Sequence, residues 1–345
     1  MGGNALSYDS VRLAKADYER MAEVCTSKLQ ALYPGKQLHA IEAYRAKETF
    51  GDLDILIEST GFDPFVAASK LDAIEMVRNG PVTSIGVLVR PEKATRDDNV
   101  FQVDFITIAP DSFDYAKSYF AHCDQGNLVG RLFHATGLSH RHDGLYYYFR
   151  DGGYKFREIL LTKDYCQALL FMGYRPDTFK AGFETLEDMF VFVASSEFFN
   201  SAIFLLENRN AQSRIRDRKR PTYTAFLKWC EDTHGLPNYR YPASKKDWHT
   251  RLEEFFPGFL AKYAQGERDL AELREVKAKF NGGLVSAWTG LEGKELGKVM
   301  AAWRKKFDST EAMHRFVLSQ EQAVLQRDIV TLTCELELTY RLSDK

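Results

Sequence analysis

Three aspartates carry the clearest chemical signal in this sequence. Asp52 and Asp54 are separated by one apolar residue and followed by an apolar run, and Asp104 lies in a second apolar run. Alternate residues of a β-strand project from the same face, so Asp52 and Asp54 should lie side by side. We expect Asp104 to complete the group from a neighbouring strand.

A group of three carboxylates favours hard divalent cations. Converging carboxylates raise one another's pKa by repulsion, and Mg²⁺, which prefers oxygen ligands, removes that penalty. A pair of such ions can stabilise the attacking and leaving oxygens of a phosphoryl transfer. The pattern therefore predicts a catalytic site with two Mg²⁺ ions, which Mn²⁺ can replace.

Composition is that of an ordinary globular protein, with 345 residues, 45% hydrophobic and 27% charged. This length favours two or three structural units. No apolar run is long enough to cross a membrane, and no signal peptide precedes the first helix. The five cysteines are scattered without CxxC spacing, which favours a cytoplasmic protein without a zinc site. Nothing in the sequence indicates an obligate protein partner or a membrane partner.

Charge is unevenly distributed along the chain. Between Leu205 and Thr310 there are 21 Lys and Arg residues against 14 Asp and Glu, and the rest of the chain has 25 against 34. This asymmetry indicates a polyanion-binding region joined to one that bears carboxylates, or simply a solvated surface.

The order of apolar runs and turn residues predicts an α+β protein, with a small mixed sheet covered on one side. Strands are expected over Leu38–Ile41, Leu53–Ile57, Ser84–Val89, Phe101–Ile108 and Gly144–Phe149. Helices are expected over Ser10–Leu32, Phe65–Val77, Asp111–Thr136 and Leu161–Phe171, and over most of the chain beyond Phe183. Ser139–His142 is assigned to a loop, and Gly2-Gly3 to a flexible end.

The residues around the aspartate pair resemble the palm of family X DNA polymerases, in the DNA polymerase beta nucleotidyltransferase superfamily. The matching residues are Arg45, Lys47, Glu48, Gly51, Asp52, Asp54 and Leu56, with Val103-Asp104-Phe105 as the strand of the third carboxylate. The resemblance implies that Asp52 and Asp54 bind both metal ions. It also implies that Asp104 binds the ion that activates the attacking hydroxyl, and that Arg45 and Lys47 offset phosphate charge.

A second group of residues resembles the nucleotide-selecting region of the same family. By this likeness Tyr119 and Phe120 face the sugar, Asp124 flanks the incoming base, Asn127 contacts its minor-groove edge and Arg131 contacts template or primer. The implied organisation is a palm over residues 1–110, a thumb-like region over 111–200 and a helical, basic, nucleic-acid-binding domain over 201–345.

The sequence also departs from the family pattern. The Gly-Ser that holds the triphosphate is replaced by Ile41-Glu42, and the anionic Glu42 would repel a triphosphate if it pointed inward. A Thr-Gly-Ser turn is replaced by Ala121-His122-Cys123. Too few residues precede Leu38 for the family's usual DNA-binding domain.

Two basic segments follow in the second half. Arg214, Arg216, Arg218, Lys219 and Arg220 form a dense run suited to phosphate contacts, or to an exposed helix end. Gly290–Met300 resembles part of the tRNA-binding region of CCA-adding enzymes, where Lys294 at a helix start would hold a phosphate. Ordinary helix capping is the alternative for this segment.

These features together predict a nucleotidyltransferase that adds nucleoside monophosphates from nucleoside triphosphates to a nucleic-acid 3′-hydroxyl. A DNA primer–template is the first expected acceptor, and the 3′ end of tRNA, as in CCA addition, is the alternative. A nucleic-acid-binding protein that has lost catalysis is the third reading, against which the three retained aspartates argue.

Overall fold

The computed structural model describes residues 3–93 and 99–336, which form two compact units. The first unit contains the described residues up to 148 together with 158–259, and the second contains 149–157 and 260–336. The expected α+β class is confirmed. The boundaries expected after residues 110 and 200 both fall inside the first unit. Across the described residues no helix is long and apolar enough to cross a membrane.

A mixed five-stranded sheet forms the centre of the first unit, in the order β2-β4-β7-β6-β5. Its strands are β2 (Leu38–Ala40), β4 (Asp52–Glu58), β5 (Glu75–Asn79), β6 (Val82–Leu88) and β7 (Val100–Ile108). Strands β4 and β7 run parallel, and the other neighbouring pairs run antiparallel. The parallel pair, buried on both faces, is rich in Ile, Leu, Val and Phe, as such strands require.

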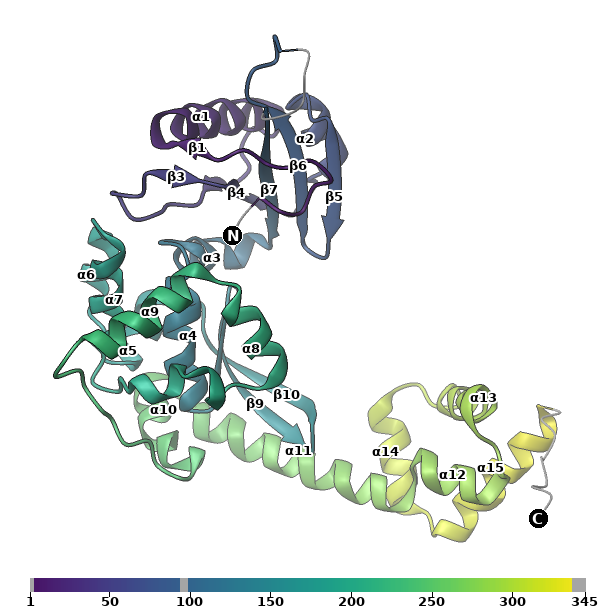
Figure 1. The fold of residues 1–345 in the computed structure, drawn as a ribbon. Coiled ribbons are helices and arrows are strands. Elements are labelled where there is room, and N and C mark those ends of the chain that lie inside the picture. Colours follow the sequence, from purple (N-terminus) through teal and green to yellow (C-terminus); the bar gives the residue numbers. More distant parts are fainter. Residues whose placement is uncertain (1–2, 94–98, 337–345) are drawn as a thin grey trace. The chain divides into compact units, whose positions relative to one another are not determined.

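Alternation along β4 and β7 separates two faces of this sheet. One face packs against α1 (Lys15–Leu32) and α2 (Pro64–Lys70), which lie on the same side of the sheet (Figure 1). The strand residues on this face are Leu53, Ile55, Ile57, Phe101, Val103 and Phe105. On the other face Leu56 and Ile106 pack against α3 (Phe113–Phe120). Because side chains alternate, the three aspartates lie on the face away from α1 and α2.

The expected helix over 111–136 is interrupted, which is a correction to the sequence analysis. A short 3₁₀ turn, η1 (Pro110–Ser112), leads into α3, and α4 (Gln125–Ala135) begins only after a sharp bend. In the bend His122 and Cys123 adopt left-handed backbone conformations, with φ of 57° and 62°. Left-handed residues cannot continue a right-handed helix, so the chain turns here and α4 takes a new direction.

Two further expectations about local structure were wrong. The helix expected over Phe65–Val77 ends at Lys70, because Asp72 is left-handed with φ of 56° and the chain then forms β5. The segment expected to be a loop at Ser139–His142 lies largely in β8 (Leu138–Arg141). Strand β8 pairs with β9 (Gly144–Asp151), and β10 (Tyr154–Thr162) extends this second sheet into a region expected to start a helix.

The remainder of the first unit is helical. It contains α5 (Tyr165–Phe171), α6 (Pro176–Ala181), α7 (Leu186–Ala194), η2 (Ser201–Phe204), η3 (Leu206–Asn208), α8 (Ala211–Arg218), α9 (Pro221–Asp232), η4 (Lys245–Trp248) and α10 (His249–Phe255). Helix α8 is anchored by a buried ion pair, in which Arg209 Nη2 lies 2.7 Å from Asp217 Oδ2. Asp217 is completely buried, so this pair ties α8 to Arg209 at the end of η3.

The second unit is a bundle of helices entered through α11 (Phe259–Lys279). Its other helices are α12 (Gly282–Thr289), α13 (Gly293–Arg304), α14 (Thr310–Ser319) and α15 (Gln322–Glu335). Trp303 lies in its core and stacks on Phe280 with ring centroids 4.1 Å apart. Lys294 occupies the first turn of α13.

The segment before α1 crosses one end of the central sheet. Strand β1 (Leu13–Ala14) pairs with β3 (Thr49–Phe50), which immediately precedes β4. Upstream, the amide of Val11 donates to the carbonyl of Val100. The chain between residues 3 and 14 is therefore tied to the ends of the two strands that carry the aspartates.

Close packing between α3 and α4 depends on Gly126. A Cβ at this position would lie 2.1 Å from the backbone oxygen of Tyr119, whereas one at Gly130, also in α4, would meet only ordinary contacts with His140. We expect Gly126→Ala to lower the free energy of unfolding by about 1–3 kcal/mol through overpacking. Gly130→Ala should be neutral or stabilising by up to about 1 kcal/mol because alanine favours helix. Thermal unfolding of the two variants tests this, and equal effects would contradict it.

Candidate metal centre

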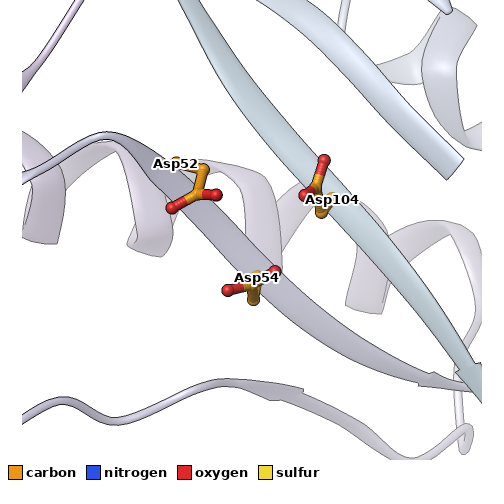
Figure 2. Close-up of side chains that lie close together, drawn as sticks. All are labelled: Asp52, Asp54 and Asp104. Carbon is orange, nitrogen blue, oxygen red and sulfur yellow. The ribbon is translucent and has the colours of Figure 1, made fainter. Parts of the chain in front are cut away.

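The parallel register of β4 and β7 brings the three predicted aspartates together. Asp54 lies directly opposite Asp104 in the pairing, and Asp52 lies two residues earlier on the same face of β4. One carboxylate oxygen from each residue can be chosen so that all three atoms lie within 4.8 Å of one another. Figure 2 shows the two side chains of β4 beside that of β7. This spacing is close enough for the three groups to bind a common metal ion.

Burial makes these carboxylates difficult to ionise. Desolvation raises the pKa of all three, and raises that of Asp54 to about 8 with further contributions from the charges of Asp52 and Asp104. The pKa of Asp104 rises to about 6, and the side chain is only 9% exposed. Three carboxylates so close together lower the stability of the folded protein unless a positive charge offsets their mutual repulsion. The donor set is all oxygen, as Mg²⁺ or Mn²⁺ requires.

Asp104 is held by two neighbours that the sequence analysis did not identify. Gln102 Nε2 donates to both carboxylate oxygens of Asp104, at 2.9 and 3.0 Å, and Ser84 donates a hydrogen bond from β6. The amide of Ala5 donates to Gln102 Oε1 at 2.9 Å, which fixes which way the amide group faces. The signal available in the sequence was a glutamine two residues before Asp104, in a mostly apolar run where alternate residues share one strand face.

Gly3 is a structured part of the site rather than part of a flexible end, which corrects the sequence analysis for this residue. Its amide donates a hydrogen bond that lowers the pKa of Asp52 against the effect of burial. Gly3 has φ of +87°, and a Cβ would lie 2.5 Å from the carbonyl oxygen of Gly51. Only glycine fits this close approach without strain. Gly2 lies outside the described residues.

A cavity of about 750 Å³ adjoins the carboxylates within the first unit. Of the residues expected to bind nucleotide, the cavity is lined by Lys47, Tyr119, Phe120, Asp124 and Asn127, alongside Asp52 and Asp54. It is also lined by Arg12, Tyr18 and Phe50, which the sequence analysis missed. Tyr18 stacks on Phe50 with centroids 3.8 Å apart, and both rings line the same cavity as Asp52 and Asp54.

Two polar side chains of the cavity are placed to meet a ligand. Lys47 Nζ lies 4.5 Å from the centre of the Phe50 ring. Burial raises the pKa of Asp52, and the charge of Lys47 partly offsets that rise. The side-chain nitrogen of Asn127 is buried and has no hydrogen-bond partner in the described protein. An unpaired buried donor is costly, so a ligand acceptor in the cavity would stabilise Asn127.

Two arginines that were predicted to bind nucleotide or nucleic acid, Arg45 and Arg131, instead contact other segments of the first unit. Arg45 does not line the cavity, since its guanidinium donates to the carbonyl of Ala181 and lies 3.5 Å from the carboxylate of Glu184. Arg131 Nη2 donates to the carbonyl of Ile203 at 3.1 Å. Both arginines join segments of the first unit to one another. Glu42 lines the cavity and is exposed, so an anionic side chain does stand beside the site.

The basic run after residue 213 divides into two sets. Arg216, Lys219 and Arg220 line the cavity. Arg218 is exposed and is not among the lining residues, and Arg214 donates to the carbonyl of Arg209 at 3.0 Å. Arg220 forms an ion pair with Asp124 across the cavity. Lys294 belongs to the second unit and does not line this cavity.

Comparison of the sequence with known protein families and with curated proteins finds no match in either.

Divalent-cation binding should strengthen steeply with pH. The pKa values of Asp54 and Asp104 are raised to about 8 and 6, so protons occupy these carboxyls at low pH and a cation must displace them. We expect the affinity for Mn²⁺, measured by calorimetry, to rise at least about tenfold between pH 6 and pH 8.5. An affinity independent of pH would contradict a site built on these groups.

Removing one charge should stabilise the metal-free protein. The folded-state pKa of Asp54 lies above its unfolded value, so the stability from its bound proton is complete near pH 4 and is lost as pH rises through 8. At pH 8.5 in EDTA we expect Asp54→Asn to raise the free energy of unfolding by about 1.4 kcal/mol or more, equivalent to one pKa unit. The gain should vanish near pH 4. The exposed Asp114→Asn serves as the control, and an unchanged or lower stability of Asp54→Asn at pH 8.5 would contradict the expectation.

Proposed function

We propose that this protein is a magnesium-dependent nucleotidyltransferase of the DNA polymerase beta type. It would add nucleoside monophosphates from nucleoside triphosphates to a nucleic-acid 3′-hydroxyl. The observation that carries the proposal is the group formed by Asp52, Asp54 and Asp104, at the edge of a cavity also lined by cations and aromatic rings. This combination suits a reaction in which positioning and charge stabilisation lower the barrier.

The aspartates would divide the work of holding two Mg²⁺ ions. Asp52 and Asp54, adjacent on one face of β4, would contribute to both ions, and Asp104 on β7 would hold the ion nearer the acceptor. When bound, the ions supply charge that lowers the pKa of the attacking hydroxyl and offsets charge on the leaving pyrophosphate. Asp104, which would lie beside the ion nearer the acceptor, would help to receive the hydroxyl proton.

The other cavity residues would bind and orient the nucleotide. Tyr119 and Phe120 pack edge to face, with centroids 5.2 Å apart, and offer apolar surface to the sugar. Asn127 supplies the unpaired donor described above. Lys47 lies where it would contact phosphate oxygens close to Asp52.

The acceptor is a DNA primer in the leading form of this proposal. The placement of Asp124 and Asn127 in the same cavity as the aspartates supports it, because those residues carry the likeness to template-directed polymerases. The 3′ end of tRNA is the alternative acceptor. It is supported by the segment around Lys294, which occupies the first turn of α13, where helix amides favour an anion.

An incorporation assay tests the proposal. Purified protein with Mg²⁺ is offered labelled nucleotides on a gapped DNA duplex and on tRNA that lacks its 3′ end. Template-dependent extension of DNA supports the first acceptor, and addition limited to C and A on tRNA supports the second. No incorporation on either, with nucleic-acid binding retained, would refute the proposed enzyme activity.

The matched variants sharpen this assay. Asp54→Asn should reduce incorporation at least about a thousandfold, because charge stabilisation of the transition state is lost, and should change nucleic-acid affinity little. Asp114→Asn, on the exposed side of α3, should leave both properties unchanged. Full activity of Asp54→Asn would place the catalytic site elsewhere.

A further inference from the structure

The junction of α8 and α9 places positive charge on the wall of the metal-site cavity. Lys219 and Arg220 are the two residues that join the helices, and Arg216 lies one turn earlier in α8. All three line the cavity that contains Asp52 and Asp54. In the sequence these residues belong to a basic run that we expected to contact a nucleic-acid backbone.

The start of α9 adds a second source of positive potential. Pro221 and Thr222, the first two residues of α9, also line the cavity. Arg220 at the cap position makes no side-chain capping hydrogen bond, and Pro221 has no amide hydrogen. The donors left without a side-chain cap are therefore the amides of Thr222 and Tyr223. The amino end of a helix carries a partial positive charge and unpaired amide donors, which suit a phosphate.

Ion pairs with acidic residues fix the side chains of Arg216 and Arg220. Asp217, completely buried, accepts from Arg209 and, at 3.2 Å, from Arg216 Nε. Arg220 is held by its ion pair with Asp124. Arg216 therefore keeps one part of its guanidinium on a buried anchor while its side chain remains about half exposed at the cavity. Such pre-organised cations lose little conformational freedom on binding.

The charges of the lining residues suit a nucleoside triphosphate bound together with two divalent ions. Its lining contains five cations and, with the adjacent Asp104, five anions. Two divalent ions would add four positive charges, and a nucleoside triphosphate carries about as many negative ones. The occupied cavity would then be close to neutral, with the metal ions on the β4–β7 side.

We propose that Arg216, Lys219 and the start of α9 bind the triphosphate chain of the nucleotide, replacing the Gly-Ser segment that is absent at Ile41-Glu42. This inference rests on the proposed nucleotidyltransferase function for the identity of the ligand. Lys47 and Arg12 complete the cationic lining of the same cavity. The basic run thus serves the substrate, while Arg218 faces solvent.

Binding of inorganic tripolyphosphate tests the assignment without requiring catalysis. We expect Arg216→Ala and Lys219→Ala each to weaken tripolyphosphate binding about tenfold in calorimetry, with Mg²⁺ and also in EDTA, through loss of one charge-assisted hydrogen bond. Arg218→Ala removes the same charge from the same helix outside the cavity and should change affinity less than about twofold. Lys219 is exposed, so Lys219→Ala should keep the wild-type melting temperature. Arg216→Ala also removes one donor to the buried Asp217, so its binding is measured well below its own melting temperature.

The result separates this inference from the proposed function. If Arg216→Ala, Lys219→Ala and Arg218→Ala bind tripolyphosphate with equal affinity, the inference is overturned even if the enzyme proves active. A tenfold loss confined to Arg216→Ala and Lys219→Ala would support it even if no incorporation is found. Weakened binding of a single-stranded oligonucleotide without terminal phosphates, with tripolyphosphate binding unchanged, would assign the cations to a nucleic-acid backbone and overturn the inference.

Discussion

The parallel pairing of β4 with β7 is the constraint on which the rest of the site depends. Its register puts Asp54 directly beside Asp104, and the two-residue repeat of a strand adds Asp52 to the same face. The opposite faces of the same strands supply much of the hydrophobic core. A one-residue shift of either strand would bury its aspartates in that core, so the core enforces the geometry of the carboxylates.

Bringing three carboxylates together costs free energy, and the surrounding structure reduces that cost. Gln102 and Ser84 donate to Asp104, and the amide of Gly3 donates to Asp52. These hydrogen bonds favour the ionised forms that a cation needs, while desolvation opposes them. Ala5 and Gly3 connect this balance to the segment before α1, so the beginning of the described chain is part of the site.

The cavity beside the three aspartates is assembled from segments far apart in the sequence. Its walls come from the central sheet, from the α3–α4 bend and from the α8–α9 junction. The bend requires left-handed residues at His122 and Cys123, and the junction is fixed by the buried pair of Arg209 and Asp217. The cavity therefore brings together charged side chains from segments that only the tertiary structure places side by side.

Several features could be predicted from the sequence because they depend on local pattern. Alternation within an apolar run identified β4 and β7 and the shared face of Asp52 and Asp54. Two of the errors lie in short, mostly polar segments: β5 was expected to continue a helix, and β8 was expected to be a loop. In both places antiparallel pairing with the next strand of the chain, across the two-residue turns Asn79↔Val82 and Arg141↔Gly144, selects the strand.

The roles of individual cations were decided by tertiary structure alone. The sequence by itself determined that the chain has three aspartates able to share a strand face, a Glu at position 42 and a basic run after residue 213. It did not determine that Arg45 and Arg131 are occupied by backbone carbonyls, or that Arg216 and Lys219 face the cavity while Arg218 does not. A long cationic side chain takes its partner from whatever the fold brings near it, and helix phase sets its direction.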